Sequence, residues 1–218
     1  MPRLRAGLAA ALLTIALLAG GAAIGGRQGV AQNSIDPQRP DRHFRIENPA
    51  GLSDADALAI YDRIRASMVA GYRLSSLPYA GSYIAWPRFN TVPYRSAQHG
   101  ERYVNNYAND AAKAYGDYES SGSMPAGAVL VKDSFTVTQR GDVFSGPLFM
   151  MEKMAAGFDP PRRNWRYTMI MPDGSLFGTS KGQGAERIGF CAACHELTGA
   201  GRDGLFYVPE DYRVRFSE

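Results

Sequence analysis

The segment Cys191-Ala-Ala-Cys-His195 constrains this chain more than any other stretch. Two cysteines separated by two residues and followed at once by a histidine form the attachment signature of a c-type haem. On one helical turn, thiols three residues apart share a face and can reach the two vinyl groups of one porphyrin. His195 follows closely enough to ligate the iron of the same macrocycle. The sequence therefore predicts one covalent haem c, bound by Cys191, Cys194 and His195.

Three other interpretations of the motif remain open. Zinc requires four ligands, of which this segment offers three, so His43 or His99 would have to complete the site. A thioredoxin-type redox pair would follow a strand in a βαβ unit, whereas this pair lies near the end of the chain. A structural disulfide would leave the adjoining histidine unexplained. We expect haem attachment over all three.

The N-terminus predicts export. Arg3 and Arg5 precede a run of small and apolar residues over 6–26, which is the pattern of a secretory signal peptide. Small residues at Gly29 and Ala31 favour a signal peptide over 1–31 and a periplasmic mature protein. An uncleaved membrane anchor is the alternative, because about 20 apolar residues can span a bilayer. Haem is attached to such motifs outside the cytoplasm in bacteria, so the two features agree.

The mature chain is expected to be neutral and to form one domain. Removal of residues 1–31 leaves 187 residues with 21 basic and 21 acidic side chains. This balance gives no electrostatic reason to expect nucleic acid as a partner. Residues 32–52 are polar, hold three prolines and show no periodicity, which predicts an extended tail. Residues 53–218 are long enough for a single core and are expected to form a single haem domain.

The spacing of apolar residues predicts helices in the first half of the chain and strands in the second. Ser53, with Asp56 three residues on, forms a capping box for a helix over 53–71. A second helix is predicted from residue 105 or 106 to about 118, capped by an asparagine. The aromatic-rich and proline-rich stretch over 77–93 is expected to wrap something apolar.

After these helices the hydrophobic period changes to two. Residues 127–138, 146–154 and 165–171 are predicted strands, and their short connections indicate an antiparallel arrangement. The fold class is therefore α+β: an antiparallel β-sheet with flanking helices and a C-terminal c-type haem-attachment helix.

The late position of the motif excludes two classes of cytochrome. Only 23 residues follow His195, and none is Met or His. Small electron-transfer cytochromes c carry an early motif with a downstream axial Met, which is impossible here. The helical-bundle cytochromes c′ place the motif late, but they are helical throughout. A predominantly β protein with a C-terminal haem remains.

The chain resembles the cytochrome P-460 and cytochrome c′-beta family over about 86–216. The resemblance rests on four segments: His99-Gly100 with Arg102-Tyr103-Val104, Pro125-Ala126-Gly127 before Val-Leu-Val-Lys-Asp, Asn164-Trp165-Arg166-Tyr167, and the haem motif. It implies a sheet-rich homodimer whose haem has an open sixth position. In the cytochrome P-460 branch a lysine is bonded to the porphyrin and the protein oxidises hydroxylamine. Relatives without that bond bind diatomic gases such as nitric oxide.

Three residues outside the motif match positions of this family. Lys132 matches the lysine of the crosslink, and its alternative is a solvated lysine on a strand. Arg102 matches a distal arginine that could donate hydrogen bonds to a ligand, and its alternative is a surface ion pair. Glu186 matches a distal carboxylate that could act as a general base, and its alternative is an exposed loop residue.

Three functions follow from these residues. The first is oxidation of hydroxylamine or a related small nitrogen species, with Glu186 and Arg102 as catalytic residues and a soluble electron acceptor as partner. The second is binding of nitric oxide or carbon monoxide without turnover. The third is electron transfer, for which one of five methionines would supply a sixth ligand (Met150, Met151, Met154, Met169 and Met171). We expect His195 to be the single protein ligand, in a pocket walled by the sheet and by residues 77–93.

Overall fold

The computed structural model describes residues 35–36 and 39–216. The predicted signal peptide over 1–31 lies outside the described residues. Within the predicted tail, β1 (Ile35–Asp36) pairs antiparallel with β2 (Arg39–His43). The following segment contacts the domain, because Ile46 is buried and its amide donates to the Gly100 carbonyl at 3.1 Å. Part of the expected tail is thus paired and packed.

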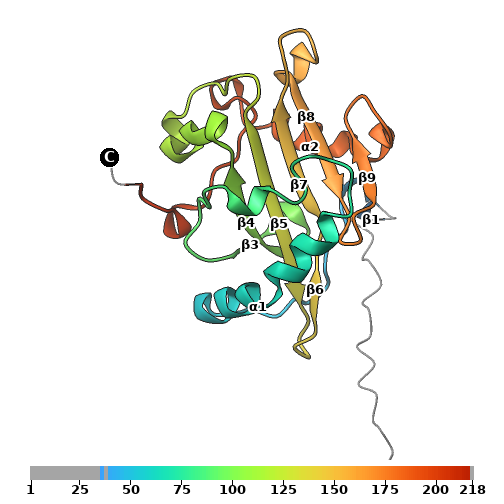
Figure 1. Ribbon diagram of the computed structural model, residues 1–218, viewed down its shortest axis with the longest axis vertical. Coiled ribbons are helices and arrows are strands. Elements are labelled where there is room, and N and C mark those ends of the chain that lie inside the picture. Colours follow the sequence, from blue (N-terminus) through green and yellow to red (C-terminus); the bar gives the residue numbers. More distant parts are fainter. Residues whose placement is uncertain (1–34, 37–38, 217–218) are drawn as a thin grey trace, which may run out of the picture.

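A seven-stranded antiparallel sheet forms the centre of the molecule (Figure 1). Its order is β3-β4-β5-β7-β8-β9, and β6 pairs with the far end of β5. The strands are β3 (Tyr94–Ser96), β4 (Arg102–Ala108), β5 (Val129–Val137), β6 (Val143–Ser145), β7 (Leu148–Lys153), β8 (Trp165–Ile170) and β9 (Leu176–Thr179). The predicted α+β class is confirmed, and β5, β7 and β8 lie within the three ranges predicted as strands.

Two α-helices flank the sheet. Helix α1 (Asp54–Tyr72) is capped as predicted, because the Asp56 amide donates to the Ser53 hydroxyl at 3.2 Å. Helix α2 (Gly189–Glu196) carries the cysteine-histidine motif. Single 3₁₀ segments connect the other elements: η1 (Tyr83–Ala85), η2 (Ala97–His99), η3 (Asp110–Ser120), η4 (Pro160–Arg162), η5 (Ala185–Arg187), η6 (Ala200–Arg202) and η7 (Glu210–Tyr212).

The second predicted helix is wrong at its start. Asn105 and Asn106 lie inside β4, whose seven residues are all buried. The helical segment is η3, and its cap is Asn109, which accepts a hydrogen bond from the Ala112 amide at 3.1 Å. The side chains of Asn105 and Asn106 are used within the core instead, since Asn105 donates to Asp133 at 3.0 Å. The sequence also predicts a short strand that ends at Asn105, but β4 continues to Ala108. A strand buried on both faces lacks the polar alternation that would mark this continuation.

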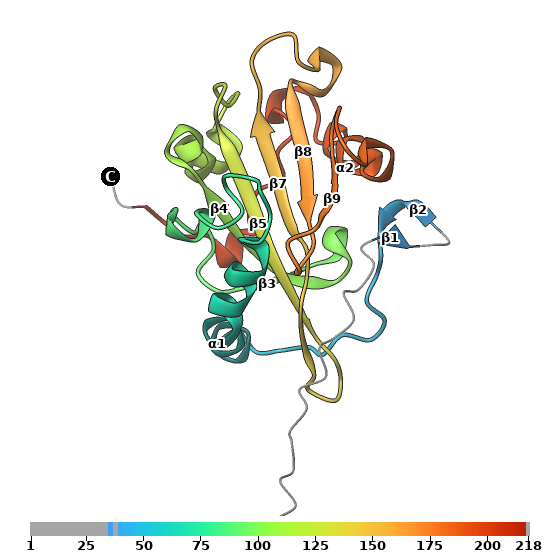
Figure 2. The same ribbon diagram turned by 45° about the vertical axis from the view of Figure 1, so that its right-hand side comes forward.

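Two hydrophobic cores lie on opposite faces of the sheet. Helices α1 and α2, which pack against these cores, lie at opposite sides of the sheet (Figure 2). Side chains alternate along a strand, so neighbouring residues of β5 point to opposite faces. Val129 and Val131 face α1, and we call this side the α1 face. Leu130 packs into the core that includes Phe190 of α2. We call this second side, which also carries Lys132, the α2 face.

Asp133 anchors the core on the α1 face. Its carboxylate is fully buried and accepts hydrogen bonds from Tyr61 of α1 at 2.6 Å and Tyr83 of η1 at 3.0 Å. The third donor is Asn105 of the neighbouring strand. Burial raises the pKa of Asp133 to about 6, although the three donors act in the opposite direction. One carboxyl group therefore joins the helix, the η1 segment and two strands.

This raised pKa predicts a pH-dependent contribution to stability. The unfolded-state pKa of an aspartate is about 3.9, so the folded state binds this proton more tightly. The contribution of Asp133 is then complete below about pH 4 and is lost as the pH rises through about 6. The unfolding free energy of the wild type minus that of Asp133→Asn should fall by up to about 3 kcal/mol between pH 4 and pH 7. Urea unfolding at four pH values checks this, and a constant or rising difference would contradict it.

Candidate cofactor-binding site

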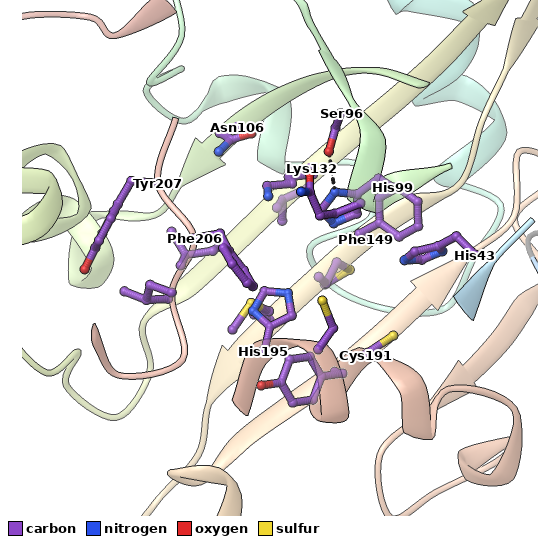
Figure 3. Close-up of a pocket in the computed structure, with 18 of the residues that line it drawn as sticks. His43, Ser96, His99, Asn106, Lys132, Phe149, Cys191, His195, Phe206 and Tyr207 are labelled. Carbon is purple, nitrogen blue, oxygen red and sulfur yellow. Dashed lines mark hydrogen bonds between the residues drawn. The ribbon is translucent and has the colours of Figure 1, made fainter. Parts of the chain in front are cut away.

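A cavity of about 550 Å³ lies between α2 and the α2 face of the sheet (Figure 3). Its walls come from β3 and η2, from the central strands, from α2, and from residues 205–209. Aromatic side chains contribute much of the lining: Tyr94, Phe149, Tyr167, Phe190, Phe206 and Tyr207. The volume is in the range of small-molecule and cofactor sites, which are concave and mostly apolar.

All three functional residues of the motif reach this cavity. Cys191, Cys194 and His195 line it, while Ala192 between them is buried in the core behind α2. Both thiols are free. Burial raises the pKa of Cys191 to about 12 and also raises the pKa of Cys194. A redox-active pair depends on a lowered thiol pKa, so these thiols lack the property that a thioredoxin-type site requires.

A backbone hydrogen bond fixes the His195 ring. Nδ1 lies 2.7 Å from the Gly204 carbonyl oxygen, which can only accept, so Nδ1 carries the proton. The other ring nitrogen, Nε2, is then unprotonated and available as a metal ligand. Burial lowers the pKa of His195 to about 4, which keeps the imidazole neutral. Tyr167 and Phe206 pack against the ring, each with a centroid separation of 5.3 Å.

Lys132 enters the same cavity from the centre of the sheet (Figure 3). It pairs with Asn106 on β4 and with Phe149 on β7, so the three side chains form a row across the α2 face. Burial lowers the pKa of Lys132 to about 8, with the charge of Cys194 opposing the shift. Part of the population is therefore a neutral amine, which is the nucleophilic form of lysine.

Two further histidines line the cavity, and the sequence had suggested them only as completing ligands for zinc. His99 Nδ1 lies 2.8 Å from the Ser96 hydroxyl, and the His43 and His99 rings are 5.4 Å apart. The Phe149 ring packs against both imidazoles, with a centroid separation of 4.9 Å in each case. His43 Nδ1 is buried without a hydrogen-bond partner among the described residues. Burial lowers the pKa of His43 to about 3 and that of His99 well below its ordinary value, so both rings are neutral.

Arg102 lies beside the cavity and is not among its lining residues. The side chain is fully buried, and its Nη1 donates to the carbonyls of Phe44 at 3.1 Å and His99 at 3.0 Å. Its Nε and Nη2 have no partner among the described residues. The guanidinium thus holds the backbone that carries His99 and the segment after His43.

Glu186 lies outside the cavity. It belongs to η5, its side chain is 77% exposed, and its nearest charged neighbour is Arg187 at 3.6 Å. The structure therefore brings together Cys191, Cys194, His195 and Lys132, but it does not bring Glu186 to them.

The expected contribution of residues 77–93 to the pocket wall is wrong. Leu77, Tyr79 and Trp86 pack with α1 on the α1 face, and no residue of this range lines the cavity. The aromatic side chains of 77–86 are used to cover Asp133 and α1 instead. Of the five methionines considered as sixth ligands, Met151 lines the cavity from the α2 face. The Met150 side chain packs into the core on the α1 face, and Met169 is fully buried.

Metal-binding clusters, membrane-spanning helices and related proteins give no further indication of function. Among the described residues, no group of three or more His, Cys, Asp or Glu side chains is arranged to hold a metal ion by itself. No helix in the described part of the chain is long and apolar enough to cross a membrane. In comparisons with known proteins, no family model and no curated protein matches this sequence.

The lowered pKa of Lys132 predicts selective chemistry in the haem-free protein. Acetic anhydride reacts with the neutral amine, so acetylation of Lys132 should reach half its maximal rate near pH 8. An ordinary lysine would do so near pH 10.4. Peptide mass spectrometry after short labelling between pH 6 and pH 11 measures this rate for each lysine. A midpoint for Lys132 above pH 10 would contradict the buried position of its ammonium group.

Proposed function

We propose that this protein is an exported single-haem c-type cytochrome, similar to the cytochrome P-460 and cytochrome c′-beta family, that binds a small nitrogenous molecule. The observation that carries the proposal is the convergence of Cys191, Cys194 and His195 on one largely aromatic cavity. The resemblance adds a homodimer and a soluble electron acceptor to the proposal.

The residues around the cavity fit a covalently attached haem. Two free thiols three residues apart face the same space as an imidazole whose Nε2 is available for ligation. Phe149, Phe190 and other aromatic side chains offer apolar surface to a macrocycle. A haem held here would supply an iron centre that exchanges electrons and offers an axial position to a small molecule.

The side chains of the cavity have distinct roles in this proposal. Cys191 and Cys194 would hold the haem through thioether bonds, and His195 Nε2 would ligate its iron. Lys132 is the residue available for an additional bond to the porphyrin edge. His99 hydrogen-bonds a guest through the nitrogen that Ser96 does not engage, and His43 can do the same through its unpartnered Nδ1. Phe149, packed against both rings, excludes water from them.

The positions of Arg102 and Glu186 favour binding over turnover. Oxidation of hydroxylamine releases protons together with electrons and therefore benefits from a general base. Glu186 is exposed outside the cavity, and Arg102 is not among the residues that line it. The neutral imidazoles of His43 and His99 are weak bases, since their pKa values are lowered. Reversible binding of a small neutral molecule is the function that this environment serves best.

Hydroxylamine oxidation is the second candidate. Lys132 lines the cavity with a partly neutral amine, which is the form required for a bond to carbon. In the family that the chain resembles, that bond accompanies hydroxylamine oxidation. Electron transfer alone is the third candidate, with Met151 as the sixth ligand.

Attachment through both cysteines is tested by their removal. The exported wild-type protein should carry one haem that resists acid-acetone extraction, and intact mass should show one haem added per chain. Cys191→Ala with Cys194→Ala should lose this covalent haem completely, because no other cysteine is present. Extraction-resistant haem in the double variant would contradict the assignment.

Ligand titrations separate the candidate functions. The ferrous holoprotein should bind carbon monoxide and nitric oxide, and His99→Leu should weaken nitric oxide binding about fivefold, as expected for loss of a hydrogen bond worth about 1 kcal/mol. Glu186→Gln, an exposed change outside the cavity, is the matched control and should leave binding unchanged. Optical titration measures each affinity.

Each contrary result identifies another function. Hydroxylamine-dependent reduction of an added electron acceptor would establish turnover. A low-spin ferrous spectrum unaffected by carbon monoxide would establish a sixth protein ligand and favour electron transfer.

A further inference from the structure

The loop after α2 holds the carbonyl that fixes His195. Asp203 and Gly204 both have positive φ, at 49° and 79°. This turn points the Gly204 carbonyl at His195 Nδ1. A non-glycine residue in this region is strained and persists only where its surroundings hold it. Contacts of Asp203 must therefore maintain the turn.

Asp203 is held by both its side chain and its backbone. Lys153 Nζ donates to the two carboxylate oxygens at 2.6 and 2.8 Å. The Met124 amide donates to Oδ2 at 2.8 Å. The Asp203 carbonyl accepts from Trp165 Nε1 at 2.6 Å. Four hydrogen bonds thus fix the residue that precedes Gly204.

Lys153, the cation of the ion pair with Asp203, belongs to the sheet. Lys153 is the last residue of β7 and pairs with Trp165 on β8. Its Nζ lies 4.9 Å from the centroid of the Trp165 ring, and the side chain is 9% exposed. The Asp203 side chain is 5% exposed. Because both charges are buried, removing one leaves the other without a partner, which is strongly destabilising for its surroundings.

We propose that Lys153 and Asp203 are positioning residues for His195, an inference that rests on the proposed function. The ion pair fixes the Gly204 carbonyl, and this carbonyl fixes the tautomer and the rotation of the imidazole. A hydrogen bond donated by the ring nitrogen that does not ligate also makes a ligating imidazole more basic. Lys153, at the end of a sheet strand, therefore sets the strength of the bond between His195 and the iron.

The test compares holoproteins that carry covalent haem. In Lys153→Met, the iron–histidine stretching band of the ferrous resonance Raman spectrum should move to lower frequency and broaden. The ferric/ferrous midpoint potential should rise, because a less basic ligand stabilises ferric iron less. Lys153→Arg keeps the charge and should return both readouts towards their wild-type values.

Arg166→Met is the matched control. Arg166 also joins β8 to β7, through an ion pair with Glu152, but this pair does not contact the loop at Asp203. Its removal should leave the band and the potential at their wild-type values. An equal shift in Arg166→Met would overturn the inference, since the shift would then report a general loosening of the two strands.

The remaining outcomes are also decisive. Wild-type values in folded Lys153→Met overturn the inference and leave the proposed function intact. If Lys153→Met does not fold, Asp203→Asn takes its place, because it preserves side-chain shape and removes the charge. A wild-type band and potential in Asp203→Asn would also overturn the inference and leave the proposed function intact. Absence of an iron–histidine band from the wild-type holoprotein would count against the proposed function as well.

Discussion

The structure depends on the alternation of side chains along β5. Lys132 and Asp133 are adjacent in the chain, yet they point into opposite sides of the sheet. Asp133 accepts hydrogen bonds from α1 and η1 on one side, and Lys132 lines the cavity beside α2 on the other. A shift of register by one residue would exchange them. The hydrogen bonds of Asp133 therefore also keep the lysine in the cavity.

Desolvation gives the cavity its chemical character. Burial is the largest cause of the lowered pKa of Lys132, His43, His99 and His195, and it also keeps the thiols protonated. The three imidazoles and both thiols are therefore neutral, whereas Lys132, with a pKa of about 8, is still mostly protonated at neutral pH. Neutral imidazoles and thiols suit neutral guests and apolar surface better than metal cations, which would need charged ligands to replace lost hydration.

Much of the fold could be predicted from local patterns. The Ser53 cap, the period-two strands and the Cys191–His195 helix each depend on a few neighbouring residues. The failures have a common cause, which is burial by distant elements. Asn105 resembles a helix cap in sequence, but in the sheet it donates to Asp133.

The candidate site was predictable only in part, for the same reason. His43 reaches the cavity because the chain before α1 folds back over α2, and no local signal encodes that path. Lys132, which only the resemblance singled out, lines the same cavity as the motif. Glu186 was nine residues from His195 in sequence, but its η5 segment turns the side chain to solvent.

Helix α2 closes the core on its side of the sheet, and it lies within the last thirty residues of the chain. Among the described residues, none beyond Ile170 belongs to the core on the α1 face, so this core can form while the C-terminal segment is still unfolded. Until α2 docks, both thiols stay accessible to whatever attaches a cofactor. Once Phe190, Ala192 and Leu205 are buried, that access narrows. In the proposed function, the haem would be attached before the second core closes, so its attachment would be a step in the folding of this chain.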